Sequence, residues 1–243
     1  GGIYGANLTN ITIQIDGTIS YTDDREAWPR YDGRVVECMY FEEIDGISFT
    51  SSNGPVLKGL INGNGERWWG AIDYLVYAEN RPRLLHMYNS RNILIENVYF
   101  KNSPYWNVWL EDVRNVHIHH SNVSARRDDI DYHDLYDITA FNTDGFDIAG
   151  ENVYIHDCEI WNDDDCIAVK EQNGGGKQSN CSRNMLFERI NASGLGLTIG
   201  SIGPSELHTC VQNITFRDCY MYRTFKGIYM KSRPPDNVKV VTT

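Results

Sequence analysis

Two acidic turns hold the side chains of this sequence that are best suited to chemistry. The first is NTDG over residues 142–145, and the second is NDDDC over residues 162–166. Asp144 precedes Asp164 and Asp165 by 20 and 21 residues. If the fold makes these turns neighbours, three carboxylates crowd one patch. They then repel one another when ionised, which raises the pKa of at least one of them.

Carboxylates of unequal pKa are the groups that glycoside hydrolysis needs. A protonated carboxylic acid donates its proton to the leaving oxygen, while an ionised carboxylate activates water. Lateral offset between adjacent turns predicts a separation of roughly 6.5 to 9.5 Å between acid and base, with room for that water. Two plainer interpretations stay open, because aspartates are common in turns and clustered carboxylates bind calcium.

The elements that carry these turns form an irregular repeat. Segments of alternating apolar residues recur behind a leading asparagine, and the last four steps span 23, 37, 32 and 29 residues. Each segment is rich in Ile, Val, Phe and Tyr and has period two, which predicts a strand with one buried face. The leading asparagines are Asn10, Asn92, Asn115, Asn152, Asn184 and Asn213.

A second short strand follows at a nearly constant distance from the leading asparagine, as in DCIAVK from Asp165 and GIYMKS from Gly227. Repeats of this length without helical periodicity predict an all-β parallel β-helix, a solenoid whose coils bury their core by stacking. An antiparallel sandwich is the rival, and it requires tight hairpins between the strands. In a β-helix, equivalent positions lie about 4.8 Å apart, so the two acidic turns converge.

Composition narrows the possible partners. The chain has 22 Lys and Arg against 33 Asp and Glu, a net charge of −11, which disfavours nucleic acid and anionic membranes. No apolar run approaches the ~18 residues of a membrane span, and no signal segment is visible. We expect no nucleic-acid or membrane partner, and the pattern predicts no particular oligomeric state.

Six cysteines and six Asn-x-Ser/Thr sequons together favour a secreted, extracellular glycoprotein with disulfides. Six cysteines allow up to three disulfides, and none of them forms a CxxC pair of the zinc or redox type. Some sequons also arise by chance in a chain rich in Asn, Ser and Thr. The predicted glycosylation sites are Asn7, Asn10, Asn122, Asn180, Asn191 and Asn213.

Four blocks resemble, in order and spacing, the signature blocks of the pectin-degrading glycoside hydrolases of the polygalacturonase and rhamnogalacturonase group. They are NTDGFDI (142–148), NDDDCIAVK (162–170), SGLGLTIGSIG (193–203) and GIYMKS (227–232). Segments at 16–30, 61–70 and 81–110 also resemble that family's early coils. The resemblance implies a right-handed parallel β-helix that cleaves a pectin-like or related acidic polysaccharide with inversion and without a cofactor. We expect residues 1–243 to form a single domain that lacks its first and last coils.

Carried over by position, the resemblance implies that Asp164 is the general acid and that Asp144 and Asp165 hold and activate the water. Lys231 resembles the lysine that contacts a sugar carboxylate. Lys170 and Lys231 each follow their leading asparagine by 18 residues, which predicts that both project from one edge. The predicted substrate-binding residues are Asn142, Lys170, Tyr229 and Lys231.

Two positions depart from the family pattern. The usual histidine of the third block is Leu195, and the usual arginine of the fourth is Tyr229. Leucine and tyrosine replace neither the imidazole nor the guanidinium chemically. We therefore predict weak or no cleavage of plain polygalacturonate, relative to a substrate with a neutral or differently linked sugar at that point.

Aromatic and histidine clusters are weaker candidates. Tryptophan pairs at 68–69 and at 106 and 109 suit either sugar stacking or packing, and packing is favoured. His117, His119 and His120 alternate within one predicted strand. No carboxylate or cysteine accompanies them at ligand spacing, so we expect strand positions and no metal site.

Two other functions fit parts of the pattern. A catalytically silent β-helix, acting as an extracellular structural or carbohydrate-binding glycoprotein, is consistent with the missing histidine and arginine. A calcium-dependent polysaccharide lyase would use Asp163, Asp164 and Asp165 as ligands and Lys231 as the base. An activity assay separates the silent protein from the hydrolase, and unsaturated products that absorb in the ultraviolet identify a lyase.

Overall fold

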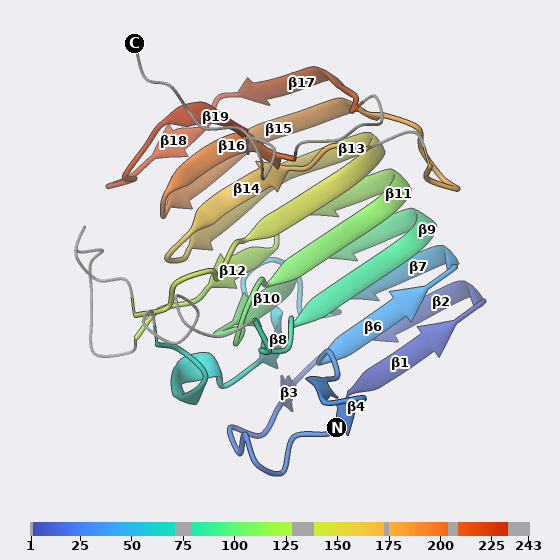
Figure 1. The fold of residues 1–243 in the computed structure, drawn as a ribbon, viewed down its shortest axis with the longest axis vertical. Coiled ribbons are helices and arrows are strands. Elements are labelled where there is room, and N and C mark those ends of the chain that lie inside the picture. The colour runs from blue at the N-terminus through green and yellow to red at the C-terminus, as the bar shows by residue number, and fades with distance from the viewer. Residues whose placement is uncertain (1, 71–78, 128–138, 173–174, 204–208, 233–243) are drawn as a thin grey trace.

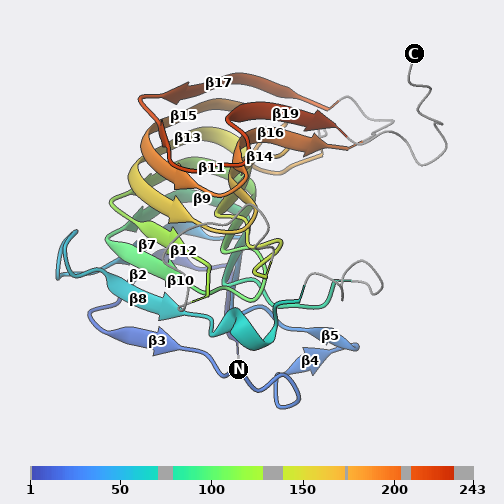
Figure 2. The same cartoon turned by 90° about the vertical axis from the view of Figure 1, so that its left-hand side faces the viewer.

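The chain winds into a right-handed parallel β-helix, with its strands stacked coil upon coil (Figures 1 and 2). The computed structural model describes residues 2–70, 79–127, 139–172, 175–203 and 209–232. Within these residues the one helix is the three-residue 3-10 turn η1, Gly65–Arg67. No helix in this part of the chain has the length and apolar character that a bilayer crossing needs.

Long strands form the middle of the stack and pair in parallel along most of their length. Val108 lies opposite Leu85 on one side and Phe146 on the other, and Ile118 lies between Ile95 and Ile155 in the same way. Equivalent residues of successive coils are therefore direct neighbours. These strands are β9 (Leu85–Glu96), β11 (Val108–His119), β13 (Phe146–Trp161) and β15 (Ser182–Ser193).

Shorter strands complete the coils. Phe146 of β13 pairs in parallel with Ile167 of β14, and the only antiparallel strand pair among the described residues joins β4 to β5. The antiparallel sandwich is therefore wrong. The shorter strands are β1 (Ile3–Ala6), β2 (Thr9–Gln14), β3 (Thr18–Ser20), β4 (Arg30–Tyr31), β5 (Arg34–Val35), β6 (Met39–Glu42), β7 (Asp45–Thr50), β8 (Gly59–Asn62), β10 (Val98–Lys101), β12 (Asn122–Ser124), β14 (Asp165–Val169), β16 (Gly196–Ile202), β17 (Val211–Arg217), β18 (Tyr220–Met221) and β19 (Ile228–Ser232).

One apolar core runs through the inside of the coils. The period-two pattern turns alternate side chains inward, and Phe100, Phe146 and Phe187 are completely buried there with Leu110 and Ile155. Burial of apolar surface contributes roughly 25 cal/mol per Å² to the free energy of folding. Stacking supplies this burial, because each coil covers the apolar side chains at the open end of its neighbour.

The leading asparagines form a ladder along one corner. Asn92, Asn115, Asn152, Asn184 and Asn213 all have a left-handed backbone, with φ between 54° and 58°, which asparagine tolerates better than most residues. From Asn115 onward, the side-chain amide of each leading asparagine donates to the side-chain oxygen of the leading asparagine one coil earlier, at 2.9 to 3.2 Å. The sequence repeat is therefore a corner where every coil must turn.

One disulfide joins Cys181 to Cys210, 29 residues apart. The disulfide keeps to the prediction of a disulfide-bonded chain, and it is one of the three that six cysteines allow, since the other four cysteines are free. Cys38, Cys158 and Cys166 are buried, and burial raises the pKa of each thiol. These three cysteines therefore pack as small apolar side chains.

Candidate active site

The two acidic turns lie on consecutive coils, as the spacing predicts. The Gly145 amide donates to the Asp165 carbonyl at 2.9 Å, which fixes Asp144 beside Asp165. Asp144, Asp164 and Asp165 are all buried, and each offers a carboxylate oxygen within 4.8 Å of the others. These oxygens lie closer than the predicted separation of roughly 6.5 to 9.5 Å, because the hydrogen bond from the Gly145 amide to the Asp165 carbonyl holds the two turns side by side.

Two buried asparagine amides hold these turns in place. Asn162 donates to the carbonyl oxygens of Thr143 and Asp165, at 2.8 and 2.9 Å. Asn107, one coil earlier, donates to the carbonyls of Thr143 and Asp144, at 3.0 and 3.2 Å. Sequence reasoning did not identify either asparagine as a site residue, although Asn162 is the first residue of the second acidic turn.

Asp164 combines burial with a shortage of positive charge. Its pKa is raised to about 6, first by burial and then by the neighbouring Asp165 carboxylate. The Asp165 amide donates to Asp164 Oδ1 at 2.9 Å and partly offsets this shift. Asp164 therefore carries a proton in mildly acidic solution, as a general acid must.

Asp144 lies deeper in the same electrostatic environment. Burial, followed by the Asp147 and Asp164 carboxylates, raises its pKa well above the ordinary value. Its Oδ1 atom has no hydrogen-bond partner among the described residues. A protonated Asp144 thus holds a hydrogen bond available for a molecule that enters the site.

Asp165 is the member of the triad that has a cation. Lys231 Nζ lies 2.5 Å from Asp165 Oδ2, and the Tyr229 hydroxyl donates to Oδ1. Burial and this hydrogen bond raise the pKa of Tyr229, which keeps it a donor. Two of the predicted substrate-binding residues therefore lie at the site, where they contact a carboxylate of the protein itself.

Lys170 is engaged by a carboxylate that sequence reasoning missed. Its ammonium lies 2.7 Å from Asp147 Oδ1, whose side chain is completely buried, and it also donates to the Gly200 carbonyl at 3.2 Å. Burial acts to lower the pKa of Lys170, but the charges of Asp147, Asp144 and Asp165 together outweigh it and the pKa rises. Asp147 stands three residues after Asp144 in the first block, and we call these four aspartates (144, 147, 164 and 165) the acid cluster.

Three other residues of the blocks lie around the cluster. Asn142 is half-buried in its turn with φ of 59°. The Asp163 carboxylate accepts the Ala140 amide at 3.0 Å and is not part of the oxygen triad. The Leu195 amide donates to the Asp164 carbonyl at 2.8 Å, so the position of the family's histidine adjoins the acid turn.

The remaining candidates lie elsewhere. Trp68 and Trp69 are buried, which agrees with packing. His117 and His119 lie on β11, and stacking adds His156 of β13, whose Nε2 is 2.9 Å from His117 Nε2. Among the described residues, the acid triad is the one group of three carboxylate, histidine or cysteine ligand atoms within 4.8 Å, and the histidines form no such group.

Comparisons with known proteins agree with this geometry. The family model described as glycosyl hydrolases family 28 matches residues 2–242. An Aspergillus niger protein named "Probable endo-xylogalacturonan hydrolase A" is 30% identical over 233 residues, which are 94% of this chain and 51% of that protein. An endopolygalacturonase of Emericella nidulans is 27% identical over 234 residues, 93% of this chain and 56% of that protein.

Solved structures show the same fold. The endo-xylogalacturonan hydrolase of Aspergillus tubingensis has a TM-score of 0.74 and 25% identity, over 94% of this chain and 56% of that one. A polygalacturonase from Erwinia carotovora has a TM-score of 0.68 at 22% identity, over 95% and 61%. The chain spans about half the length of the curated relatives it matches.

Proposed function

The chain belongs to glycosyl hydrolases family 28, and from this premise we propose that it hydrolyses a glycosidic bond in a pectin-type polysaccharide at the acid cluster. One observation carries the proposal. Two carboxyls of the triad, Asp144 and Asp164, are buried with raised pKa values, while Asp165 is ion-paired with Lys231. One residue type thus supplies a proton donor and an ionised base side by side.

In the proposed reaction, Asp164 protonates the glycosidic oxygen as the bond to the leaving sugar breaks. Asp165 takes a proton from the attacking water, and protonated Asp144 orients that water by a hydrogen bond. Oxygens up to 4.8 Å apart accommodate one water at about 2.7 to 2.8 Å from each. The family resemblance implies attack from the face opposite the leaving group and hence inversion, whereas carboxylate oxygens within 4.8 Å are closer than the roughly 6.5 to 9.5 Å of the usual inverting site. Proton NMR of the first products identifies the anomer: an inverted product supports the proposal, and a retained one contradicts it.

The proposed substrate is an acidic polysaccharide whose sugar at the cleavage point differs from plain galacturonate. Lys231 is the cation nearest the triad, and it can exchange part of its bond to Asp165 for a sugar carboxylate. Leu195 and Tyr229 offer neither an imidazole nor a guanidinium to a second carboxylate. The two relatives are named for different substrates, one for xylogalacturonan, a substituted polymer, and the other for polygalacturonate, a plain one.

A panel of plant and algal polysaccharides tests this proposal. We expect new reducing ends from substituted or esterified pectins, and much slower release from polygalacturonate. Robust cleavage of polygalacturonate contradicts the specificity, and ultraviolet-absorbing unsaturated products identify a lyase instead. A protein that binds these polymers but cleaves none of them is the silent alternative.

We further propose that the protein is an extracellular glycoprotein and that residues 1–243 form one β-helix domain. The Cys181–Cys210 disulfide and the exposed sequon asparagines Asn7, Asn180 and Asn191 support this. At Asn213 the side-chain amide donates to Asn184, so a glycan there leaves that amide a single N–H for the last hydrogen bond of the ladder. Peptide mass spectrometry after expression in a glycosylating host tests each site.

A further inference from the structure

Four histidines gather on the outside of two consecutive coils, away from the acid cluster. His117 and His119 lie on β11, His120 follows that strand directly, and His156 lies on β13. Both strands turn at the asparagine corner before they reach these residues, so the histidines lie on a different side of the coils from the acids. Three of the rings are half-buried and His120 is exposed, which leaves the group within reach of solutes.

Two of these rings bring their nitrogens together. His117 Nε2 lies 2.9 Å from His156 Nε2, although the residues are 39 positions apart in the sequence. His156 Nδ1 lies 2.5 Å from Asp157 Oδ2, and an ionised carboxylate only accepts, so this nitrogen carries a proton. In the neutral ring the lone pair is then on Nε2, where it accepts the Nε2–H of His117.

The surroundings of His156 are those of a metal-ligating histidine. Such a ring commonly donates its second N–H to a carboxylate, which fixes its tautomer and orientation. Asp157 takes this part, and the guanidinium of Arg189 holds it by two hydrogen bonds at 2.8 and 2.9 Å. His117 Nδ1 has no partner in the part of the chain that the structure describes, so the proton on Nε2 can move there and free a second lone pair.

The distance between the two nitrogens indicates which metal fits. Metal–imidazole bonds of about 2.0 to 2.1 Å that meet at a right angle place the nitrogens about 2.8 to 3.0 Å apart, whereas a tetrahedral angle needs about 3.3 to 3.4 Å. The observed 2.9 Å agrees with two neighbouring positions of a tetragonal ion such as Cu(II) or Ni(II). No third histidine, cysteine or carboxylate ligand atom of the described residues lies within 4.8 Å of both, so water completes the coordination.

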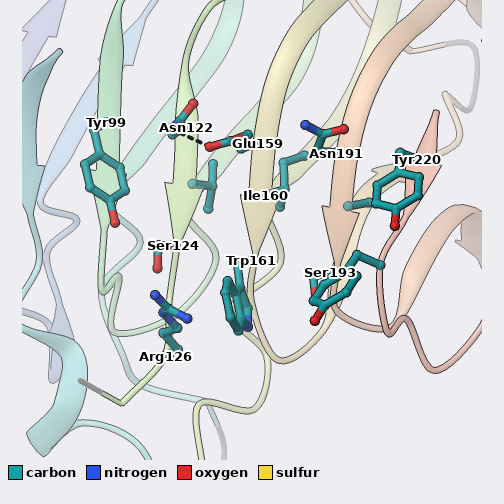
Figure 3. A pocket seen from close by; sticks show the side chains of 13 residues that line it. Tyr99, Asn122, Ser124, Arg126, Glu159, Ile160, Trp161, Asn191, Ser193 and Tyr220 are labelled. Atoms are coloured by element: carbon teal, nitrogen blue, oxygen red, sulfur yellow. Dashed lines mark hydrogen bonds between the residues drawn. The ribbon is translucent and has the colours of Figure 1, made fainter. Parts of the chain in front are cut away.

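Other candidate cation sites in the described part of the chain offer oxygen ligands or a single imidazole. The acid triad has carboxylates alone. A hollow of about 430 Å³ beside β12 is lined by one carboxylate, Glu159, which Figure 3 shows hydrogen-bonded to Asn122 at 3.2 Å, and by no histidine or cysteine. His86 is buried and lies 3.3 Å from Glu111. Two imidazole ligands on one ion therefore distinguish the histidine group from these places.

Within the histidine group, a second pair is less well prepared. The Nδ1 atoms of His119 and His120 lie 3.0 Å apart, and His119 Nε2 lies 3.5 Å from a Glu96 oxygen. His120 is exposed, and no carboxylate among the described residues holds its other nitrogen. A metal there would first have to immobilise the His120 ring, which costs side-chain entropy.

We propose that His117 and His156 form a binding site for a divalent transition metal, Cu(II) above all, that joins two consecutive coils. The proposal departs from the sequence-based expectation of no metal site, because stacking supplies His156 from the next coil. It goes beyond the proposed hydrolysis and does not depend on it. The net charge of −11 attracts cations, and an ion that bridges coils only in the folded chain stabilises the fold by mass action.

Equilibrium dialysis of the untagged protein against copper(II) chloride at pH 7 tests the site. We expect one tightly bound ion per chain. His117→Asn and His156→Asn should each raise its Kd at least about 10-fold, since loss of even an outer-shell partner commonly costs that much. His120→Asn, which removes an exposed histidine of the same group, is the matched control and should leave the Kd unchanged.

Pulsed electron paramagnetic resonance of the copper-loaded protein identifies the ligands. The remote nitrogens of two imidazoles should modulate the echo of the parent, and one imidazole should remain in either ligand variant. A spectrum with oxygen ligands alone overturns the site, as does a loss of affinity in His120→Asn equal to that in His117→Asn. Equal affinity in the parent and both ligand variants means an adventitious ion only and also overturns it.

The outcome is independent of catalysis. If the protein binds copper through these histidines but cleaves no polysaccharide, the metal site stands and the proposed function fails. If it cleaves pectin but shows no imidazole-bound copper, the reverse holds. Circular dichroism and melting temperatures without metal confirm that each variant is folded.

Discussion

Two groups of carboxylates on stacked coils show opposite electrostatics. In the acid cluster, burial raises the pKa of Asp144 and Asp164. Further along β13 and β15, the guanidinium of Arg189 donates to both oxygens of Asp157, at 2.8 and 2.9 Å, and lowers its pKa. The Tyr154 hydroxyl, followed by Arg189 and Arg217, lowers the pKa of Glu188 to about 2.

This contrast shows that burial and the available cations, and not the residue type, decide what an aspartate does here, since burial raises the pKa of Asp147 although Lys170 lies beside it. Asp164 has a raised folded pKa, so its contribution to stability is present below about pH 4 and is lost as pH rises through about 6. Asp157 and Glu188 have lowered values, so their contribution is present above about pH 4 and is lost as pH falls. We call Asp157 and Glu188, which Arg189 joins, the arginine-bridged pair. At neutral pH the acid cluster lowers the stability of the fold, and the arginine-bridged pair raises it.

Removing the proton that the acid cluster retains should have the largest effect. Asp164→Asn keeps the shape of the side chain but deletes the transferable proton, so we expect kcat to fall about 10²- to 10⁴-fold. Stability should be unchanged or slightly higher at pH 7, because a buried carboxylate becomes neutral. Turnover on the best polysaccharide of the panel and urea unfolding measure the two effects.

Asp163→Asn is the matched control for that variant. Asp163 is next in sequence, yet its carboxylate accepts the Ala140 amide outside the oxygen triad. We expect a much smaller loss of turnover. Equal losses in the two variants would mean that the turn as a whole, and not the Asp164 proton, supports catalysis.

Breaking the one ion pair of the Asp147 carboxylate should have the next largest effect, this time on stability. Lys170→Met leaves Asp147 buried and unpaired, which costs about 3 kcal/mol of unfolding free energy at pH 8. The loss should shrink at pH 4, where Asp147 takes up a proton. Adding Asp147→Asn should restore most of it, and a single variant as stable as the parent at pH 8 contradicts the pairing.

The pH dependence of catalysis sharpens the comparison further. Because the acid must be protonated, kcat/KM should fall tenfold for each pH unit above the Asp164 pKa of about 6. A rate profile on one soluble substrate from pH 4 to 8 measures this limb. A flat profile between pH 5 and 8 is incompatible with Asp164 as the acid.

The smallest effect is expected in the arginine-bridged pair. Arg189→Gln removes the charge-assisted bonds of an exposed arginine to Asp157 and to the buried Glu188. Water and salt weaken bonds at an exposed guanidinium, so the urea midpoint at pH 7 should fall by less than in Lys170→Met. The difference should shrink below about pH 4. Activity should be unchanged, and any large change in kcat contradicts the separation of the two groups.

Sequence alone predicts the features that depend on local periodicity. The β-helix follows from the alternating apolar residues behind each leading asparagine. The left-handed turn at these asparagines does not, because the repeat gives their positions and not their backbone conformation. The meeting of Asp144 with Asp164 and Asp165 follows from stacking. The partner of Lys170 does not, because the sequence places Lys170 on an edge but not Asp147 within its reach. Because the turns contain insertions of unequal length, the sequence also does not predict the contact of His117 with His156 or the pairing of Cys181 with Cys210.

Carbon-13 NMR titration of the aspartate carboxyls tests the central claim most directly. The Asp164 signal is assigned by its loss in Asp164→Asn, and the Asp157 signal by its loss in Asp157→Asn. The account predicts that Asp164 titrates near pH 6, whereas Asp157 stays ionised down to at least pH 3. Titration of Asp164 near its ordinary value of about 3.9 would contradict the account, because the buried acid would then hold no proton to give.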